Sequence, residues 1–317
     1  MKISGFSMVK NAESLFFPIK EAIESILPVV DEFVLALGDN LPEDKTEEII
    51  ASIASPKLRV VRTVWDLEKY PNGTENAHQT DIAKSHCNGD WLFYVQADEV
   101  VHEQFHAEIK AKCKQYLNDS RVEGFLFKYK HFWGDFDHYH FGHGWYKHEI
   151  RLVRNLPDVH SWESAQSFRR IPNFDGKNYR QQAGTYKLKV ILIDAYIYHY
   201  GWVRPPHLMQ KKKKALDTIH KGEAGADKLY ENAATEFNYG PLGRLVKFEG
   251  THPSVMADWI KKLDWQDQLN YSKEIKNKQR KLHKHERLKT RVTTFIENTF
   301  LGGRTIGGFK NYILLRK

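Results

Sequence analysis

The chain has 317 residues, of which 41% are hydrophobic and 13% aromatic, and its formal net charge is +8. This composition excludes an intrinsically disordered chain and supplies a core for one large domain or two modest ones. Only two cysteines, Cys87 and Cys113, are present, which excludes a disulfide framework or a cysteine zinc site and favours a reducing, cytoplasmic location.

The first hundred residues alternate strand-like apolar runs with helix-like stretches. Strands are predicted at residues 3–9, 32–37 and 58–64, and helices at 21–27 and 46–53. A further apolar run, 91–100, ends in two adjacent acids, Asp98 and Glu99. This alternation predicts a parallel sheet with helices on both faces, and such sheets bind ligands beyond the carboxyl ends of their strands.

Polar motifs follow these strands in a specific order. They are Val9-Lys-Asn-Ala-Glu13, Gly38-Asp39, Gly89-Asp-Trp91 and Gln96-Ala-Asp-Glu99. Together they resemble the family 2 glycosyltransferases of GT-A fold, although Gln96 stands where that family usually has the first acid of Asp-any-Asp. The resemblance implies a Rossmann-like, three-layer α/β/α sandwich. Since Pro205 and Pro206 interrupt the last predicted strand region, we expect this domain to cover residues 1–203 and a mostly helical, basic extension to cover residues 204–317.

The resemblance also implies an activity. The chain would move a sugar from a nucleotide-diphosphate sugar, a UDP-sugar in first place, to a hydroxyl acceptor with inversion, in cell-surface polysaccharide or glycolipid synthesis. The acceptor would be a saccharide or a lipid-linked molecule. Asn11, Glu13, Asp39 and Asp98 would bind the donor.

A divalent cation is part of the same expectation. Asp98, Glu99 and His199 would hold Mn²⁺ or Mg²⁺, and Asp98 would thereby act in catalysis. Hard cations prefer oxygen ligands and neutralise a departing diphosphate, and a neutral imidazole is a competent further ligand. For Asp39 and His199 taken alone, a turn residue and a hydrogen-bonded histidine are equal alternatives.

The middle of the chain is rich in aromatic residues. Residues 123–130 alternate as a half-buried strand, and residues 131–148 are predicted to be a loop containing Trp133 and Trp145. Aromatic faces stack on sugars, so we interpret these two tryptophans as acceptor contacts. The alternatives are a packed aromatic loop and a metal site made by the closely spaced histidines of this loop.

Two further strands carry candidate catalytic residues. After a strand at 149–154, Glu163 is the candidate general base that takes the proton of the acceptor hydroxyl, and Trp162 is a third candidate acceptor contact. An exposed glutamate on a surface loop is the alternative. A strand at 189–198 places His199 directly after its end, and residues 207–220 and 226–235 are predicted to be helical.

The C-terminal segment is basic. Residues 271–290 carry an excess of six positive charges, counting Lys278, and apolar residues follow, among them Phe295, Phe300 and Phe309. A solvated helix face, an anionic membrane surface and nucleic acid are alternatives. Because many acceptors of such transferases are lipid-linked, we favour peripheral binding to the inner face of a membrane, while no run reaches the roughly 18 apolar residues of a membrane span.

Two rival functions remain at this point. Gln96 is compatible with a non-catalytic relative that only binds nucleotide sugars, and the basic segment is compatible with a nucleic-acid-binding protein. No nucleic-acid motif accompanies the basic segment, so nucleic acid is the weaker of the two rivals.

Overall fold

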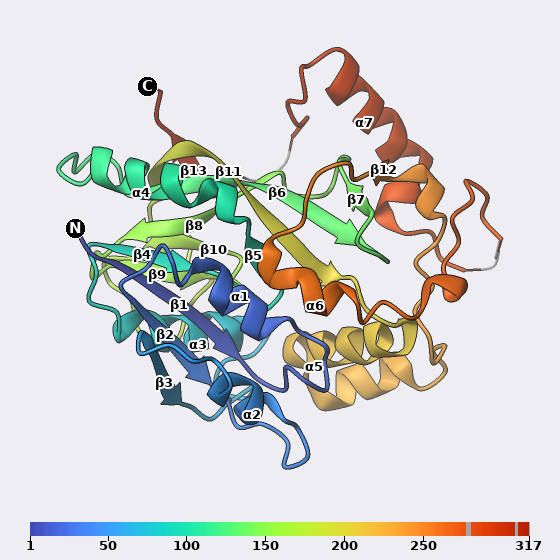
Figure 1. The fold of residues 1–317 in the computed structure, drawn as a ribbon, viewed down its shortest axis with the longest axis horizontal. Coiled ribbons are helices and arrows are strands. Elements are labelled where there is room, and N and C mark those ends of the chain that lie inside the picture. Colours follow the sequence, from blue (N-terminus) through green and yellow to red (C-terminus); the bar gives the residue numbers. More distant parts are fainter. Residues whose placement is uncertain (277–279, 308–309, 317) are drawn as a thin grey trace.

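The computed structural model describes residues 1–276, 280–307 and 310–316. Lys278 and Phe309, which entered the charge and apolar patterns above, lie outside these residues. A large mixed sheet runs through the molecule with helices on its two faces (Figure 1). The predicted α/β class is therefore confirmed.

The parallel half of the sheet comes from the N-terminal hundred residues. Its strand order is β3-β2-β1-β4, and each neighbouring pair is parallel. Strands β1, β2 and β4 are almost fully buried because both faces of the sheet are covered there, whereas β3 at the edge is partly exposed. The elements are β1 Ile3–Val9, α1 Ile19–Ile26, β2 Glu32–Leu37, α2 Thr46–Ala51, β3 Leu58–Arg62, α3 Thr74–Ser85 and β4 Trp91–Tyr94.

The other half is mixed. Strand β8 is antiparallel to both β4 and β6, and β11 runs parallel to β6. The elements are β5 Glu99–Val101, α4 His106–Gln115, β6 Gly124–Trp133, β7 His138–His140, β8 His148–Arg154, β9 Val159–Trp162, β10 Ser167–Arg170 and β11 Leu188–Trp202.

Helices cover the parallel half on two sides. Helix α1 buries Ile19, Ala22, Ile23 and Ile26, a spacing that places one apolar face on the sheet, and α4 packs in the same cluster. Helix α3 contributes Ala83 to a separate cluster with Phe6 and Tyr94. These two clusters on opposite faces of the sheet give the three layers that the sequence predicts.

The C-terminal segment differs from the prediction. It contains α5 Pro206–Tyr230, β12 Val246–Lys247, α6 Ala257–Ile260, α7 Leu288–Thr299 and β13 Tyr312–Leu314. Much of the described chain between α5 and α7 forms turns and short 3₁₀ helices, so the expectation of a mostly helical extension is wrong there. Aromatic packing explains the irregular backbone, because Trp259 and Trp265 fill one cluster with Phe132 and Trp133.

Three sequence boundaries are also corrected. The run 91–100 is two strands, because β4 ends at Tyr94 and a turn precedes β5. The predicted loop 131–148 contains the end of β6 and all of β7. Strand β11 continues to Trp202, so His199 lies inside it and pairs in register with His131 of β6.

Within the described part of the chain, no helix is both long enough and apolar enough to cross a membrane.

Candidate functional site

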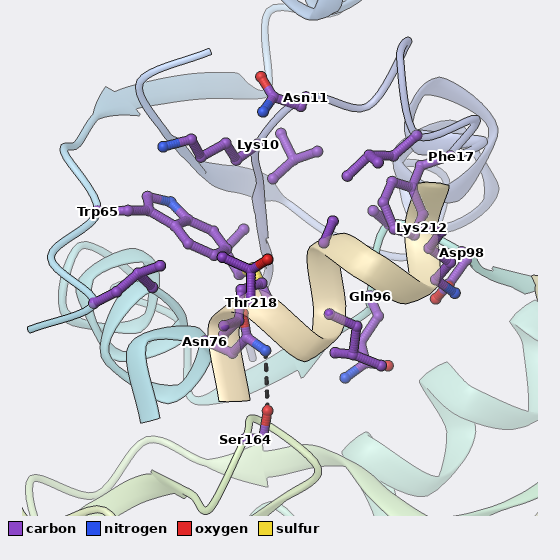
Figure 2. Close-up of a pocket in the computed structure, with 18 of the residues that line it drawn as sticks. Lys10, Asn11, Phe17, Trp65, Asn76, Gln96, Asp98, Ser164, Lys212 and Thr218 are labelled. Atoms are coloured by element: carbon purple, nitrogen blue, oxygen red, sulfur yellow. Dashed lines mark hydrogen bonds and ion pairs between the residues drawn. The ribbon is translucent and has the colours of Figure 1, made fainter. Parts of the chain in front are cut away.

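The candidate site is a cavity of about 1210 Å³ at the carboxyl ends of the parallel strands. Residues after β1, β3 and β4 form one wall, and α5 closes the other. Figure 2 shows Lys10 and Trp65 on one side, and Phe17, Lys212 and Asp98 on the other. This position, beyond the ends of parallel strands, is the one that the sequence predicts for a ligand.

A cluster of four ionisable side chains, here called the charged cluster, lies at one end of the cavity: Asp98, His199, Arg204 and Lys212. The Lys212 ammonium donates to Asp98 Oδ2 at 3.0 Å and to the Gly201 carbonyl at 2.7 Å. His199 Nε2 lies 3.7 Å from Asp98 Oδ1. A side chain at position 201 would collide with both His199 and Asp98, so glycine permits this close packing.

Burial and mutual charge set the protonation of the charged cluster. Burial would raise the pKa of the Asp98 carboxyl, but the neighbouring Lys212 ammonium holds this pKa well below its ordinary value. Burial, together with Arg204, lowers the pKa of Lys212 to about 8, and burial lowers that of His199 to about 4. At neutral pH the cluster therefore holds one carboxylate, two cations and a neutral imidazole.

Arg204 has an unusual environment. Its side chain is fully buried, and none of its three guanidinium nitrogens has a hydrogen-bond partner among the described residues. The guanidinium lies 4.9 Å from the centre of the Phe17 ring, and Phe17 itself lines the cavity. A buried cation without a hydrogen-bond acceptor is costly, which marks this position as one suited to an anion.

The tautomer of His199 follows from its neighbours. His131 Nε2 contacts the Tyr146 carbonyl at 2.8 Å and must donate to it, so neutral His131 accepts at Nδ1. That Nδ1 lies 2.9 Å from His199 Nδ1, which therefore carries the proton. The lone pair of His199 Nε2 consequently faces Asp98 and the cavity.

The opposite end of the cavity matches part of the predicted donor site. Asn11 lines the cavity in a left-handed turn, with φ of 55°, and its side-chain oxygen accepts from Leu41 N at 2.8 Å. Asp39 pairs with Lys10 at 2.9 Å and accepts from Trp65 N, which positions two lining residues. Glu13 is exposed and lies outside the lining, so the structure does not bring it to this site.

Glu99, predicted to be a metal ligand, is instead part of the core. It is fully buried, and Arg151 donates to both of its oxygens at 2.7 and 2.8 Å. The Tyr129 hydroxyl donates to the same carboxylate at 2.8 Å. Since these donors occupy the carboxylate, Glu99 is not a metal ligand in this structure.

The remaining residues do not fit the divalent cation that the resemblance implies. Gln96 carries no charge, and its side-chain nitrogen donates to the Ala165 carbonyl at 3.0 Å. Asp98 is bound by an ammonium, with Arg204 as a second nearby cation. Among the described residues, no three His, Cys, Asp or Glu side chains are grouped to hold a metal ion. A divalent ion here would add two charges to a cluster that is already positive.

The predicted acceptor tryptophans lie outside the cavity lining. Trp133 is buried and donates to the Tyr239 carbonyl at 2.9 Å, while Trp145 stacks on His140 with ring centroids 4.3 Å apart. Trp162 is 3% exposed and lies under Arg169. The tryptophans that do line the cavity are Trp65 and Trp202, which sequence reasoning did not select.

Glu163, the predicted general base, lies in the turn between β9 and β10. It adopts a left-handed backbone conformation with φ of 58°, and its neighbour Ser164 lines the cavity. Ser164 Oγ accepts from Asn76 at 3.0 Å, the contact drawn in Figure 2. Glu163 itself is not among the lining residues, so the structure places it next to the cavity rather than in it.

Comparison with known proteins gives similarities of fold. No protein-family model matches the chain, and no curated protein matches it. Among solved structures, Staphylococcus aureus TarS is 15% identical, with a TM-score of 0.39 over 73% of this chain and 42% of TarS. Residues 1–349 of TarS in complex with UDP give 14% identity and a TM-score of 0.38 over 72% of this chain and 69% of that one.

A third similar structure is glucosyl-3-phosphoglycerate synthase from Mycobacterium tuberculosis, in complex with Mn²⁺, UDP and phosphoglyceric acid. It is 18% identical, with a TM-score of 0.27 over 40% of this chain and 42% of that chain. The chain thus spans less than half the length of the first TarS structure and of this synthase.

Proposed function

We propose that the chain transfers a sugar from a nucleotide-diphosphate sugar to a hydroxyl acceptor. The observation that carries this proposal is the cavity itself. At one end it has Asn11, Lys10 and Trp65, which suit a nucleoside. At the other end it has Lys212, with Arg204 buried nearby, and positive charge there suits a diphosphate. Trp202 lines the same cavity and offers an aromatic face for a sugar.

The proposed reaction is one displacement with inversion. The acceptor oxygen attacks the anomeric carbon, the bond from that carbon to the diphosphate oxygen breaks, and the nucleoside diphosphate leaves with the electron pair. The acceptor proton passes to a carboxylate acting as general base. Positive charge near the departing diphosphate stabilises the negative charge that develops on it.

Glu163 is the base in this proposal. Its support is the turn between β9 and β10, which borders the cavity through Ser164 and holds Glu163 in a left-handed conformation. Non-glycine residues in such conformations are concentrated at functional sites. Asp98 is engaged by Lys212, and its low pKa makes it a poor proton acceptor, so its proposed part is to hold Lys212 in place.

The proposed donor is a UDP-sugar, and the proposed acceptor is a saccharide or a lipid-linked molecule of cell-surface polysaccharide or glycolipid synthesis. Helix α7 supports a location on the inner, cytoplasmic face of a membrane. Its outer face exposes Leu288, Val292 and Phe295, which repeat at helical spacing, and its inner face holds the buried Glu297 against His143. Basic Lys289 and Arg291 are also exposed. An apolar and basic face suits anionic lipid.

A donor screen tests the activity. UDP-, GDP- and CDP-sugars are incubated with the protein, and both thermal stabilisation and slow release of nucleoside diphosphate are measured. Stabilisation with release supports a transferase. Stabilisation without release, in the presence of candidate acceptors, supports the non-catalytic rival. If no donor causes stabilisation or release, the proposal of nucleotide-sugar binding is contradicted.

A further inference from the structure

We propose that Lys212, with Arg204 behind it, supplies the positive charge for the donor's diphosphate in place of a divalent metal ion. The inference rests on the proposed function, because it concerns how the same cavity binds the same donor. It replaces the cation that the resemblance implies with a side chain of α5. Three independent features of the charged cluster support it.

The first feature is the geometry of Lys212. Its side chain is 14% exposed, lines the cavity, and uses two donor positions, on Asp98 Oδ2 and on the Gly201 carbonyl. An ammonium has three N–H groups, so one donor remains for a ligand. The rings of Phe17 and Trp202 lie 5.1 and 6.0 Å from Nζ and restrict the directions from which a ligand can approach.

The second feature is the position of Lys212 in a lysine run. Its neighbours on α5 have other surroundings, since Lys213 lies over the Phe237 ring and Lys214 pairs with Asp227, 2.7 Å away. Lys211 is exposed. Only Lys212 of these four lysines lines the cavity. The helix therefore presents a single ammonium to the ligand, at the carboxylate where the metal was expected.

The third feature is Arg204. It is fully buried without a hydrogen-bond partner for Nε or either terminal nitrogen among the described residues, and it shares the Phe17 ring with Lys212. Asp98 neutralises only one of these two cations. The resulting excess of one positive charge within the charged cluster attracts an anion to this end of the cavity and disfavours a divalent cation there.

Calorimetric titration with UDP and with inorganic pyrophosphate tests the inference. Both titrations are run in EDTA and again with Mn²⁺ or Mg²⁺. We expect both ligands to bind in EDTA, with less than about a twofold change on adding metal. Lys212→Met should weaken the binding of both ligands by about 10- to 100-fold, because a charge-assisted contact is lost. Lys212→Arg should retain part of the affinity. The matched control Lys211→Met, at an exposed lysine, should bind both ligands as the parent does.

Asp98→Asn separates the two sources of charge, and it remains informative if Lys212→Met fails to fold. With a lysine-based site, Asp98→Asn keeps or strengthens anion binding, because a competing carboxylate is removed. With a metal-based site, the same change abolishes binding. Near-isosteric replacement leaves a hydrogen-bond acceptor for Lys212 in either case.

The outcomes distinguish this inference from the proposed function. Binding that needs Mn²⁺ or Mg²⁺, and is lost in Asp98→Asn, overturns the inference and leaves the transferase proposal standing. Lys212-dependent binding of pyrophosphate, with no binding of UDP or of other nucleoside diphosphates, supports the anion site and contradicts the proposed donor class. If neither ligand binds under any condition, both are wrong.

Discussion

Asp98 and Glu99 are adjacent in the chain, yet they belong to different parts of the molecule. Asp98 lines the cavity and contacts the single ammonium of Lys212, whereas Glu99 is fully buried and is held by Arg151 and Tyr129. Each forms a buried ion pair with its neighbour. The difference is that one pair faces a space that a ligand can enter, and the other is enclosed by core side chains.

The two neighbouring carboxylates therefore have different parts: Asp98 belongs to the ligand cavity, and Glu99 stabilises the core. A bidentate guanidinium with a further hydroxyl donor satisfies Glu99 and fixes β8 next to the turn before β5. The Lys212 ammonium uses two of its three N–H groups on Asp98 and Gly201, so it can donate the third to a ligand while it remains paired with Asp98. We therefore expect substitutions on the cavity side to change binding and turnover, and substitutions on the core side to change stability.

The largest effect is expected for Glu163→Gln on the cavity side. Turnover should fall by about 10² to 10⁴, because the amide cannot accept the acceptor proton. Affinity for the nucleoside diphosphate and the melting temperature should stay close to those of the parent. Initial rates at saturating donor, with calorimetry for affinity, measure both quantities.

The matched control for this variant is Glu68→Gln, since Glu68 is a carboxylate that lines the cavity. Unchanged turnover in Glu163→Gln together with a large loss in Glu68→Gln would assign the base to Glu68 instead. Equal, small losses in both would leave Asp66 and Glu223, two further carboxylates of the lining, as the candidates for the base.

On the core side, Arg151→Met should lower the free energy of unfolding by about 3–5 kcal/mol, because Glu99 is left buried without its guanidinium partner. Urea unfolding followed by circular dichroism gives this number. The exposed ion pair of Arg62 with Glu47 provides the control, and Arg62→Met should leave the unfolding midpoint unchanged. A loss below about 1 kcal/mol for Arg151→Met would show that the core pair is not structural.

The sequence predicted the order of the first three parallel strands but neither helix α3 nor the end of β4 at Tyr94. Strands β1 and β2 have the predicted bounds, because short, largely apolar runs bounded by polar turns are typical of strands covered on both faces. The C-terminal segment was less predictable, since its backbone follows long-range packing of Trp259 and Trp265 on β6 rather than a local period.

The site was predictable only in part, for physical reasons that concern particular residues. Sequence placed Asn11, Asp98 and His199 near one ligand, and the structure brings these three to one cavity. It could not separate Asp98 from Glu99, because the distinction depends on Arg151, a residue far away in the chain. Nor could it select Lys212 from four consecutive lysines, since the direction of one side chain depends on how α5 packs.

A pH-dependent effect tests the core side further. Burial raises the pKa of the Glu149 carboxyl, on β8 two residues from Arg151, to about 7 from its ordinary 4.5. The folded protein then binds more protons than the unfolded chain between these values, so the contribution of Glu149 to stability falls as pH rises from about 4.5 to about 7. Relative to the parent, Glu149→Gln should gain about 1–3 kcal/mol between pH 5 and pH 8. Urea unfolding at both pH values measures the difference, and parallel profiles for the two proteins would contradict it.

The smallest effect is expected at α7, which lies at the opposite end of the molecule from β3 in Figure 1. Lys289 is exposed on this helix, and one cation near an anionic membrane contributes about 1 kcal/mol, so Lys289→Gln should weaken binding to phosphatidylserine vesicles by about fivefold. Co-sedimentation measures this change.

Deleting residues 271–317 would be less informative, because β13 pairs with β11 and Asn311 donates to the Phe168 carbonyl. Turnover on a water-soluble acceptor should not change in Lys289→Gln, since α7 contributes no cavity-lining residue. Vesicle binding equal to that of the parent, or no vesicle binding by either protein, would assign the apolar face of α7 to another role.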